Sequence, residues 1–135
     1  MAKGKILLSV PQEKIRFYAI SCADSIHKLA WSINTSLNTT LSDHDGIAKA
    51  NELFPVLYDD STIHETRIAI VKNKVNNLVL VKGLEKIDYI LVVKGNLADS
   101  EVSKLIANIK GLANIIALIR ISPKQLKELN LVDVF

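Results

Sequence analysis

The stretch LEKIDYILVVKG, residues 84–95, holds the first group of side chains that could do chemistry. Asp88 and Tyr89 place an acid beside a phenol, directly before a run of four apolar residues. Lys94 and Gly95 close the stretch, and a glycine ahead of a helix can leave backbone N–H groups free to bind an anion. The alternative interpretation is structural: Asp88 makes a local hydrogen bond or ion pair, Tyr89 packs its ring, and Gly95 forms a turn.

A second group lies earlier in the chain, where His27 and Trp31 are four residues apart. On a helix this spacing places both side chains on one face. There they could form the aromatic and polar rim of a groove. The alternative is a partly buried tryptophan that covers the edge of the core.

Arg120 is a lone charge within the apolar run 115–121. Because a buried charge must be paired, Arg120 is either exposed or bridged to an acid, for which Asp88 and Glu101 are candidates. With Arg67 on the same sheet face it could hold an anion. The candidate ligand-binding residues are therefore His27, Trp31, Asp88, Tyr89, Lys94, Gly95 and Arg120.

No group of residues has the spacing of a known metal or catalytic site. His44 lies between Asp43 and Asp45, but neighbouring side chains rarely point at one ion, so this segment is interpreted as a solvated turn. His64-Glu65 lacks the second histidine of a His-Glu-x-x-His zinc site. The five glycines have neither of the common phosphate-loop spacings. We therefore expect no metal and no cofactor, and a non-enzymatic role is favoured over catalysis.

The chain has 135 residues, of which 49% are hydrophobic, enough for the core of a single domain over residues 1–135. Its formal charge of +3 is carried by dispersed lysines, which argues for neither nucleic acid nor an acidic surface as a partner. RNA binding on a sheet needs exposed aromatics on central strands, and only Tyr89 qualifies. The single cysteine, Cys22, excludes an intrachain disulfide and indicates a reducing compartment, the cytoplasm. No run approaches the ~20 apolar residues of a membrane span.

Alternating and apolar runs predict the strands. The run 87–93 is apolar on both faces, which is typical of a central strand covered on both sides. Residues 53–58 would be an edge strand at best, because Pro55 cannot donate to a ladder. The polar segment 38–46 is a short strand or a loop that ends in a turn at Asp45-Gly46. The other predicted strands are residues 6–10, 15–20, 64–71, 78–81 and 115–121.

Helical spacing of apolar residues predicts two main helices. The first starts with the capping pattern Ser21-x-x-Asp24 and ends near Leu37. The second begins near Asn96 and ends at Gly111, which is interpreted as a left-handed cap. Ser122 followed by proline predicts a short C-terminal helix.

This order of elements predicts an α+β fold with a mostly antiparallel sheet and two main helices packed on one face. The plan is ferredoxin-like, or split βαβ, with an extra N-terminal strand and the short C-terminal helix. The sheet face away from the helices would also be apolar at residues 87–93. Either a second copy of the chain covers it, or it is a binding surface.

The stretch 84–95 resembles the motif region of the IPExxxVDY family of bacterial proteins, and Ile87-Asp88-Tyr89 matches the second half of that signature. AISCADSIHKLAWSIN, residues 19–34, is similar to the family's strand-then-helix start, and VKNK, residues 71–74, is similar to its Asn-Lys turn. The Ile-Pro-Glu half should fall at residues 81–83, where only the apolar first position is kept. The resemblance implies a bacterial cytoplasmic protein and brings no activity with it.

These features favour a non-enzymatic binding or scaffold module that self-associates through its sheet as a homodimer. The alternative is a small-ligand-sensing regulatory domain that holds its ligand at a subunit junction near Gly95 and the first helix. An enzyme ranks third, and it would need Asp88, His27 or Arg120 to meet in one deep pocket.

Overall fold

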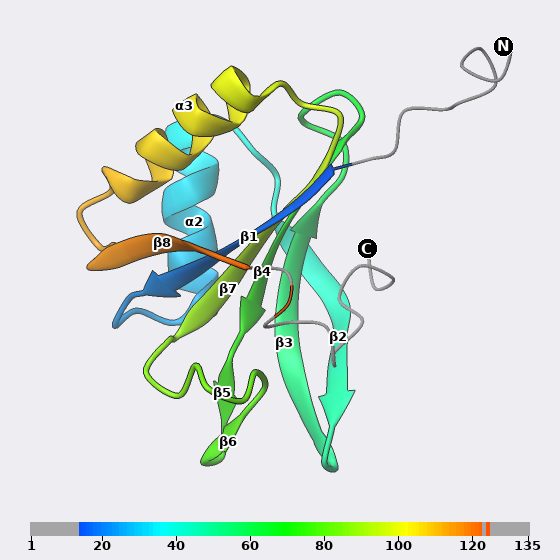
Figure 1. Ribbon diagram of the computed structural model, residues 1–135, viewed down its shortest axis with the longest axis vertical. Coiled ribbons are helices and arrows are strands. Elements are labelled where there is room, and N and C mark those ends of the chain that lie inside the picture. The colour runs from blue at the N-terminus through cyan, green and yellow to red at the C-terminus, as the bar shows by residue number, and fades with distance from the viewer. Residues whose placement is uncertain (1–13, 123, 125–135) are drawn as a thin grey trace, which may run out of the picture.

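The computed structural model describes residues 14–122 and residue 124, and it has an α+β architecture (Figure 1). One six-stranded antiparallel sheet carries two helices on one face. In this part of the chain no helix combines the length and the apolar character that a membrane span requires. The predicted strand 6–10 and nearly all of the predicted C-terminal helix lie outside the described residues. In chain order the elements are β1 (Lys14–Ser21), α2 (Ile26–Leu37), β2 (Ser42–Lys49), β3 (Glu52–Asp59), β4 (Thr66–Lys72), β5 (Lys74–Val75), β6 (Leu78–Val79), β7 (Tyr89–Gly95), α3 (Asp99–Lys110) and β8 (Ala117–Ile121).

The strand order of the large sheet is β2-β3-β4-β7-β1-β8, while β5 and β6 form a separate hairpin. β2, β3, β4 and β7 are an antiparallel meander, and β1 and β8 extend the sheet beyond β7. α2 connects β1 to β2, and α3 connects β7 to β8. The sheet therefore places the first and last described strands side by side, under α3 (Figure 1).

β7 is the central strand that its composition predicts. Leu91 packs among the residues under the two helices, whereas Ile90 and Val92 pack on the opposite face. None of the three is more than 1% exposed. On the opposite face the cover includes Leu80 and Val81 of the same chain. A second copy is therefore not needed to keep this face from water.

The N-cap of α2 is Ser25, and the predicted cap at Ser21 is wrong. The Ser25 hydroxyl accepts a hydrogen bond from the Lys28 N–H at 3.2 Å. Ser21 is instead the last residue of β1, where pairing with β8 holds its backbone extended. The predicted end at Leu37 is confirmed, and Asn38 closes the helix in the left-handed conformation with a φ of 57°.

The segment predicted to end in a turn at Asp45-Gly46 continues through those residues as strand β2. The hairpin turn between β2 and β3 falls at Ala50 and Asn51, whose φ angles are 53° and 66°. Two consecutive residues with positive φ are what a two-residue hairpin turn of type I′ requires. The prediction failed because a glycine in a polar segment marks a bulge as readily as a turn.

β3 is an interior strand with β2 and β4 on either side, so the prediction of an edge strand is wrong. Pro55 is tolerated because Asp45 and Gly46 of β2 lie opposite it, in a bulge where the register shifts. The ladder to β4 begins only at Val56. The missing N–H of the proline therefore falls where neither neighbouring strand is paired with it.

α3 begins at Asp99 rather than near Asn96, and its N-cap, Ala98, makes no side-chain hydrogen bond. Gly111 caps the C-terminus, but with a φ of −77° and not in the predicted left-handed conformation. The chain keeps turning in the right-handed sense there, with the Gly111 N–H donating to the Ala107 carbonyl at 3.0 Å. No positive φ is then required.

Candidate functional site

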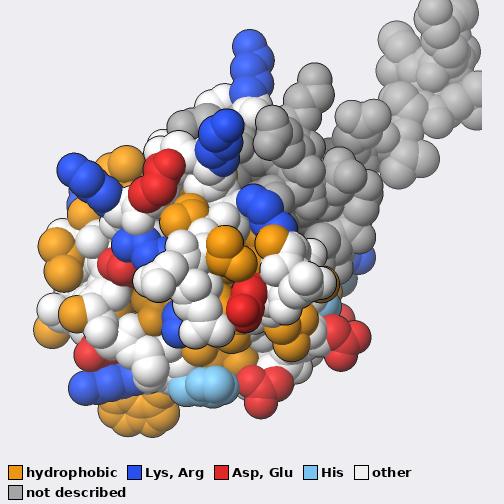
Figure 2. Space-filling model, turned by 90° about the horizontal axis from the view of Figure 1, so that it is seen from below, with side chains coloured by type: hydrophobic (Ala, Val, Ile, Leu, Met, Phe, Trp, Pro, Cys, Tyr) orange, Lys and Arg blue, Asp and Glu red, His pale blue; other side chains and the backbone are white. Residues whose placement is uncertain are grey.

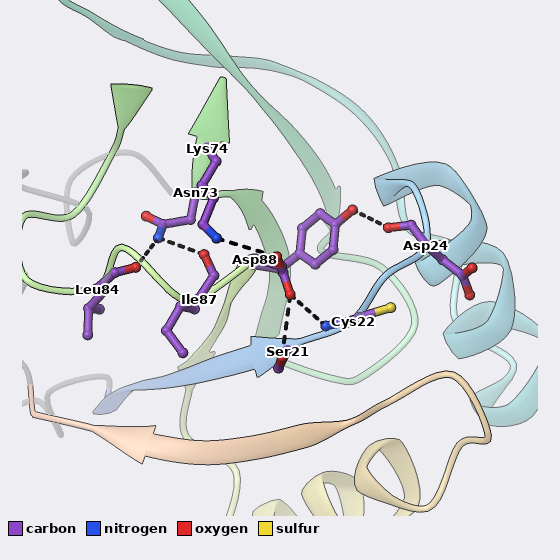
Figure 3. A network of polar contacts seen from close by, with 9 residues as sticks. Ser21, Cys22, Asp24, Asn73, Lys74, Leu84, Ile87 and Asp88 are labelled. Atoms are coloured by element: carbon purple, nitrogen blue, oxygen red, sulfur yellow. Dashed lines mark hydrogen bonds and ion pairs between the residues drawn. The ribbon is translucent and has the colours of Figure 1, made fainter. Parts of the chain in front are cut away.

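Asp88 binds the end of β1 (Figure 3). Its Oδ2 accepts a hydrogen bond from the Cys22 N–H at 2.9 Å and from the Ser21 hydroxyl at 3.4 Å. Its Oδ1 lies 3.7 Å from Nζ of Lys74. The carboxylate thus holds the junction between β1 and the turn that leads to α2, which matches the structural interpretation of this residue.

Tyr89 is a core residue, with only 4% of its surface exposed. Its hydroxyl donates to the Asp24 carbonyl, so the ring connects β7 to the turn before α2. Burial, and then the charges of Cys22, Asp88 and Asp24, raise the pKa of this phenol to about 12. A phenol with that pKa stays protonated near neutral pH, so Tyr89 acts as a hydrogen-bond donor to the backbone.

Asn73, which lies in the segment VKNK at residues 71–74, is fully buried and positions the segment after β4. Its Nδ2 donates to the Leu84 and Ile87 carbonyls at 2.8 and 2.9 Å, and its Oδ1 accepts from the Val81 N–H at 3.1 Å. The Leu80 N–H donates to the Asn73 carbonyl at 2.7 Å. Because of these bonds Leu80 and Val81 pack in the core and are not part of a strand. Only Leu78–Val79, which form β6, remain of the predicted strand 78–81.

Gly95 and Lys94 lie at the end of β7. A Cβ at Gly95 would come within 2.3 Å of the Glu65 carbonyl oxygen, so the glycine allows a close approach of two strands. Gly95 pairs with Lys14 of β1, whereas Lys94 pairs with Ile15 and Arg67 and belongs to the other sheet face. Adjacent positions on a strand point to opposite faces, so the two residues do not act on one ligand.

His27 and Trp31 lie on the outer surface of α2. Trp31 is 66% exposed, so it does not cover the edge of the core. His27 Nε2 is 3.1 Å from Oδ1 of Asp43 on β2, in an exposed contact. In the view from below, hydrophobic, histidine and acidic side chains stand side by side along one edge (Figure 2). This surface is separate from the residues around Asp88.

Arg120 is the predicted residue that lines a sizeable cleft, of about 570 Å³, between α3 and the sheet. It pairs with Tyr18 across β8 and β1, which places it on the helix side of the sheet beside Arg16. From α3, Asp99 and Ser103 face the same space one helical turn apart. We call this space the basic cleft; its lining residues are Lys14, Ile15, Arg16, Tyr18, Asp99, Val102, Ser103 and Arg120.

The basic cleft contains a buried cation that is only partly satisfied. Arg16 is 4% exposed, and its Nη2 donates to Oδ1 of Asp99, but its Nη1 finds no acceptor among the described residues. Asp99 is 78% exposed and also lies 3.8 Å from Nζ of Lys14. The hydrogen bond from Arg16, and then the charges of Lys14, Arg16 and Arg120, hold the pKa of Asp99 below its usual value. Buried polar groups are normally hydrogen-bonded. Nη1 of Arg16 can therefore donate to an acceptor atom of a bound molecule at this site.

Of the pairings considered for Arg120, neither acid is its partner. Asp88 pairs with Lys74 and Glu101 with Lys104, while the carboxylate whose pKa Arg120 lowers is Asp99. Arg67 lies opposite Lys94 in the register of β4 and β7. It shares its sheet face with Ala69 and Val71, and this is not the face of Arg120. The expected Arg67–Arg120 anion site is therefore wrong, and Arg16 takes the place of Arg67.

Of the residues that line the basic cleft, the sequence reasoning found only Arg120; the missed ones include Lys14, Arg16, Asp99 and Ser103. The available signal was the alternation of Lys14, Arg16 and Tyr18, which puts two cations on one strand face. In the described part of the chain, no three His, Cys, Asp or Glu side chains gather as a metal ion would need.

Comparison with known proteins returned no matching family model, no matching curated protein and no matching solved structure.

Proposed function

We propose that this chain is a small-ligand-binding regulatory domain that takes an anion in the basic cleft. The observation that carries the proposal is Arg16, a buried guanidinium at the wall of a cleft, whose Nη1 has no partner within residues 14–122 and 124. Lys14 and Arg120 add two further cations, against the single carboxylate of Asp99. Charge-assisted hydrogen bonds from arginine to an anion are among the strongest a protein makes.

Replacing Arg120 with glutamine should weaken the binding of small anions about tenfold. The side chain is exposed, so the fold tolerates its loss, while one charge-assisted hydrogen bond contributes about 1.5–3 kcal/mol. Isothermal titration calorimetry with phosphate, sulfate and citrate measures the affinity. Lys104→Gln is the matched control, because Lys104 is an exposed cation on α3 that pairs with Glu101 and does not line the cleft. Equal losses in the two variants would mean that net charge alone attracts the anion, and the proposal would fail.

Self-association as a scaffold is the second candidate function, and a different surface favours it. β8 is the last strand of the sheet in the described residues, and near it Ile116 and Ile119 are 73% and 58% exposed. An exposed edge with apolar side chains is a template for pairing with another strand. A homodimer through β8 would hide these side chains and leave the basic cleft open on the helix side.

Light scattering after size-exclusion chromatography tests this dimer. The natural chain should elute at twice the chain mass at micromolar concentration, and Ile119→Lys should return it to the monomer, because a charge on an edge strand opposes pairing. Leu53→Lys is the control, since Leu53 is also 58% exposed but lies on β3. A natural chain that runs as a monomer removes this candidate without touching the anion site.

For the finer description of the fold, we propose an extended ferredoxin-like plan. β7, α3 and β8 with β1 between them have the order of one split βαβ unit. On the other side, β2 and β3 are additional strands inserted between α2 and β4. The bacterial cytoplasmic setting and the IPExxxVDY lineage stay predictions; the buried Asn73 and Tyr89 and the partly exposed Asp88 act in this structure as connectors between elements.

A further inference from the structure

We propose that the ligand of the basic cleft carries a phosphoryl dianion and that it binds by displacing the carboxylate of Asp99 from Arg16. This inference rests on the proposed anion-binding function and names the ligand class and the internal competitor. The dianion belongs to free phosphate or to the end of a small phosphomonoester.

The charge of the cleft fits a dianion. Lys14, Arg16 and Arg120 bring three positive charges and Asp99 one negative charge, so the excess is two with Asp99 at Arg16 and approaches three once Asp99 swings outward. A single carboxylate would leave one to two positive charges uncompensated, whereas a phosphoryl group with a charge near −2 leaves at most one. The uncapped N-terminus of α3 adds partial positive charge to the same wall.

The directions of the donors also fit a tetrahedral group. Lys14 and Arg16 come from β1, Arg120 comes from β8, and the Ser103 hydroxyl comes from α3. A planar carboxylate has two oxygens that can meet one or two of these walls. A phosphoryl group has three free oxygens, and an arginine fork can bind two of them at once.

Asp99 occupies the position at Arg16 that the ligand would take. It is 78% exposed, yet it is the acceptor for a guanidinium that is 4% exposed. An exposed acid is readily released to water, whereas the buried guanidinium must keep an acceptor. Swinging Asp99 outward frees Nη2 of Arg16 beside the already unpartnered Nη1, which together make a two-pronged donor for the incoming oxygens.

The titratable groups that face the cleft allow the charge of the ligand to be tested by changing the pH. They are Lys14, Arg16 and Tyr18 from β1, Asp99 from α3 and Arg120 from β8. Asp99, whose pKa is lowered by the Arg16 hydrogen bond and the nearby cations, stays ionised from pH 5 to pH 7. Any change in affinity over this range then comes from the ligand itself.

The experiment is isothermal titration calorimetry of the full chain with glycerol phosphate, inorganic phosphate, sulfate and acetate at pH 5 and pH 7. Glycerol phosphate should bind up to about tenfold more tightly at pH 7, because its second ionisation lies near pH 6. Sulfate is a dianion at both values and should not change. Acetate should bind at least tenfold more weakly than sulfate. A preference of glycerol phosphate over inorganic phosphate identifies a phosphomonoester, and the reverse order identifies free phosphate.

Asp99→Asn tests the displacement. Removing the competing carboxylate should tighten binding of glycerol phosphate about tenfold, whereas Glu101→Gln, an exposed acid of the same helical turn that pairs with Lys104, should leave it nearly unchanged. Weaker binding by Asp99→Asn would overturn the displacement. If acetate binds as well as sulfate in an Arg120-dependent way, the dianion assignment is overturned while the anion-binding function stands. If no anion binds, both fall together.

Discussion

Replacing Asn73 with alanine should lower the free energy of unfolding by about 3–5 kcal/mol, because one buried and two partly buried backbone groups would each lose a partner worth about 1–3 kcal/mol. Those groups are the Leu84 and Ile87 carbonyls and the Val81 N–H. Asn73 is fully buried, so water cannot replace its amide without entering the core. Urea unfolding at constant slope measures the loss.

Two further variants make the result specific. Asn108→Ala, at an exposed position of α3, should change stability by less than about 0.5 kcal/mol. Asn73→Asp keeps an acceptor for the Val81 N–H but turns a carboxylate toward the Leu84 and Ile87 carbonyls, so it should destabilise the protein at least as much as alanine does. A loss below about 1 kcal/mol for both Asn73 variants would mean that backbone hydrogen bonds and apolar contacts hold the segment 80–88 without the Asn73 side chain.

The outcome matters for function because Asn73 fixes the segment that covers the second sheet face. Leu80 and Val81 lie over Ile90 and Val92 there. The doubly apolar run 87–93 had pointed to a partner molecule over this face, but sequence alone could not show that the cover comes from a loop of the same chain. A loop has no periodic pattern, and its position depends on one buried amide whose partners lie up to 14 residues away.

The parts of the fold that were predicted correctly are those with strong local patterns. Residues 15–20 and 87–93 became β1 and β7, and the apolar stripe through Ile26, Leu29 and Ile33 became the buried face of α2. The sequence predicts β2 only as a short strand or a loop, because its residues are mostly polar and exposed; the strand exists through its pairing with β3 and not through its own composition.

The basic cleft lay beyond sequence reasoning for a similar reason. Arg16 and Arg120 are neighbours only because β1 and β8 pair. No local sequence pattern indicates which strands pair with each other. The side of the sheet can be read from alternation within a strand, so Lys14 and Arg16 were predictable as one group. Arg67 was joined to Arg120 in their place because the relative faces of separate strands were unknown.

Gly95 gives the second large effect. Replacing it with alanine should destabilise the protein by about 3 kcal/mol or more, because overpacking against fixed atoms costs about 1–3 kcal/mol and the residue has a φ of 152° that alanine rarely adopts. The new Cβ would lie 2.3 Å from the Glu65 carbonyl oxygen and 2.9 Å from Cα of Thr66. Both are backbone atoms at the start of β4, so the strand itself would have to shift.

Gly83→Ala separates the clash from the backbone strain. Gly83 also has a positive φ, of 93°, but a Cβ there would meet nothing within 4 Å. It should therefore lose only about 1 kcal/mol, the ordinary cost of a side chain in that region. Thermal and urea unfolding of the two variants give the difference directly. Equal losses in the free energy of unfolding would mean that β4 shifts at Thr66 at little cost. The close approach of β4 and β7 beside Lys14 would then not be the reason for a glycine at the end of β7.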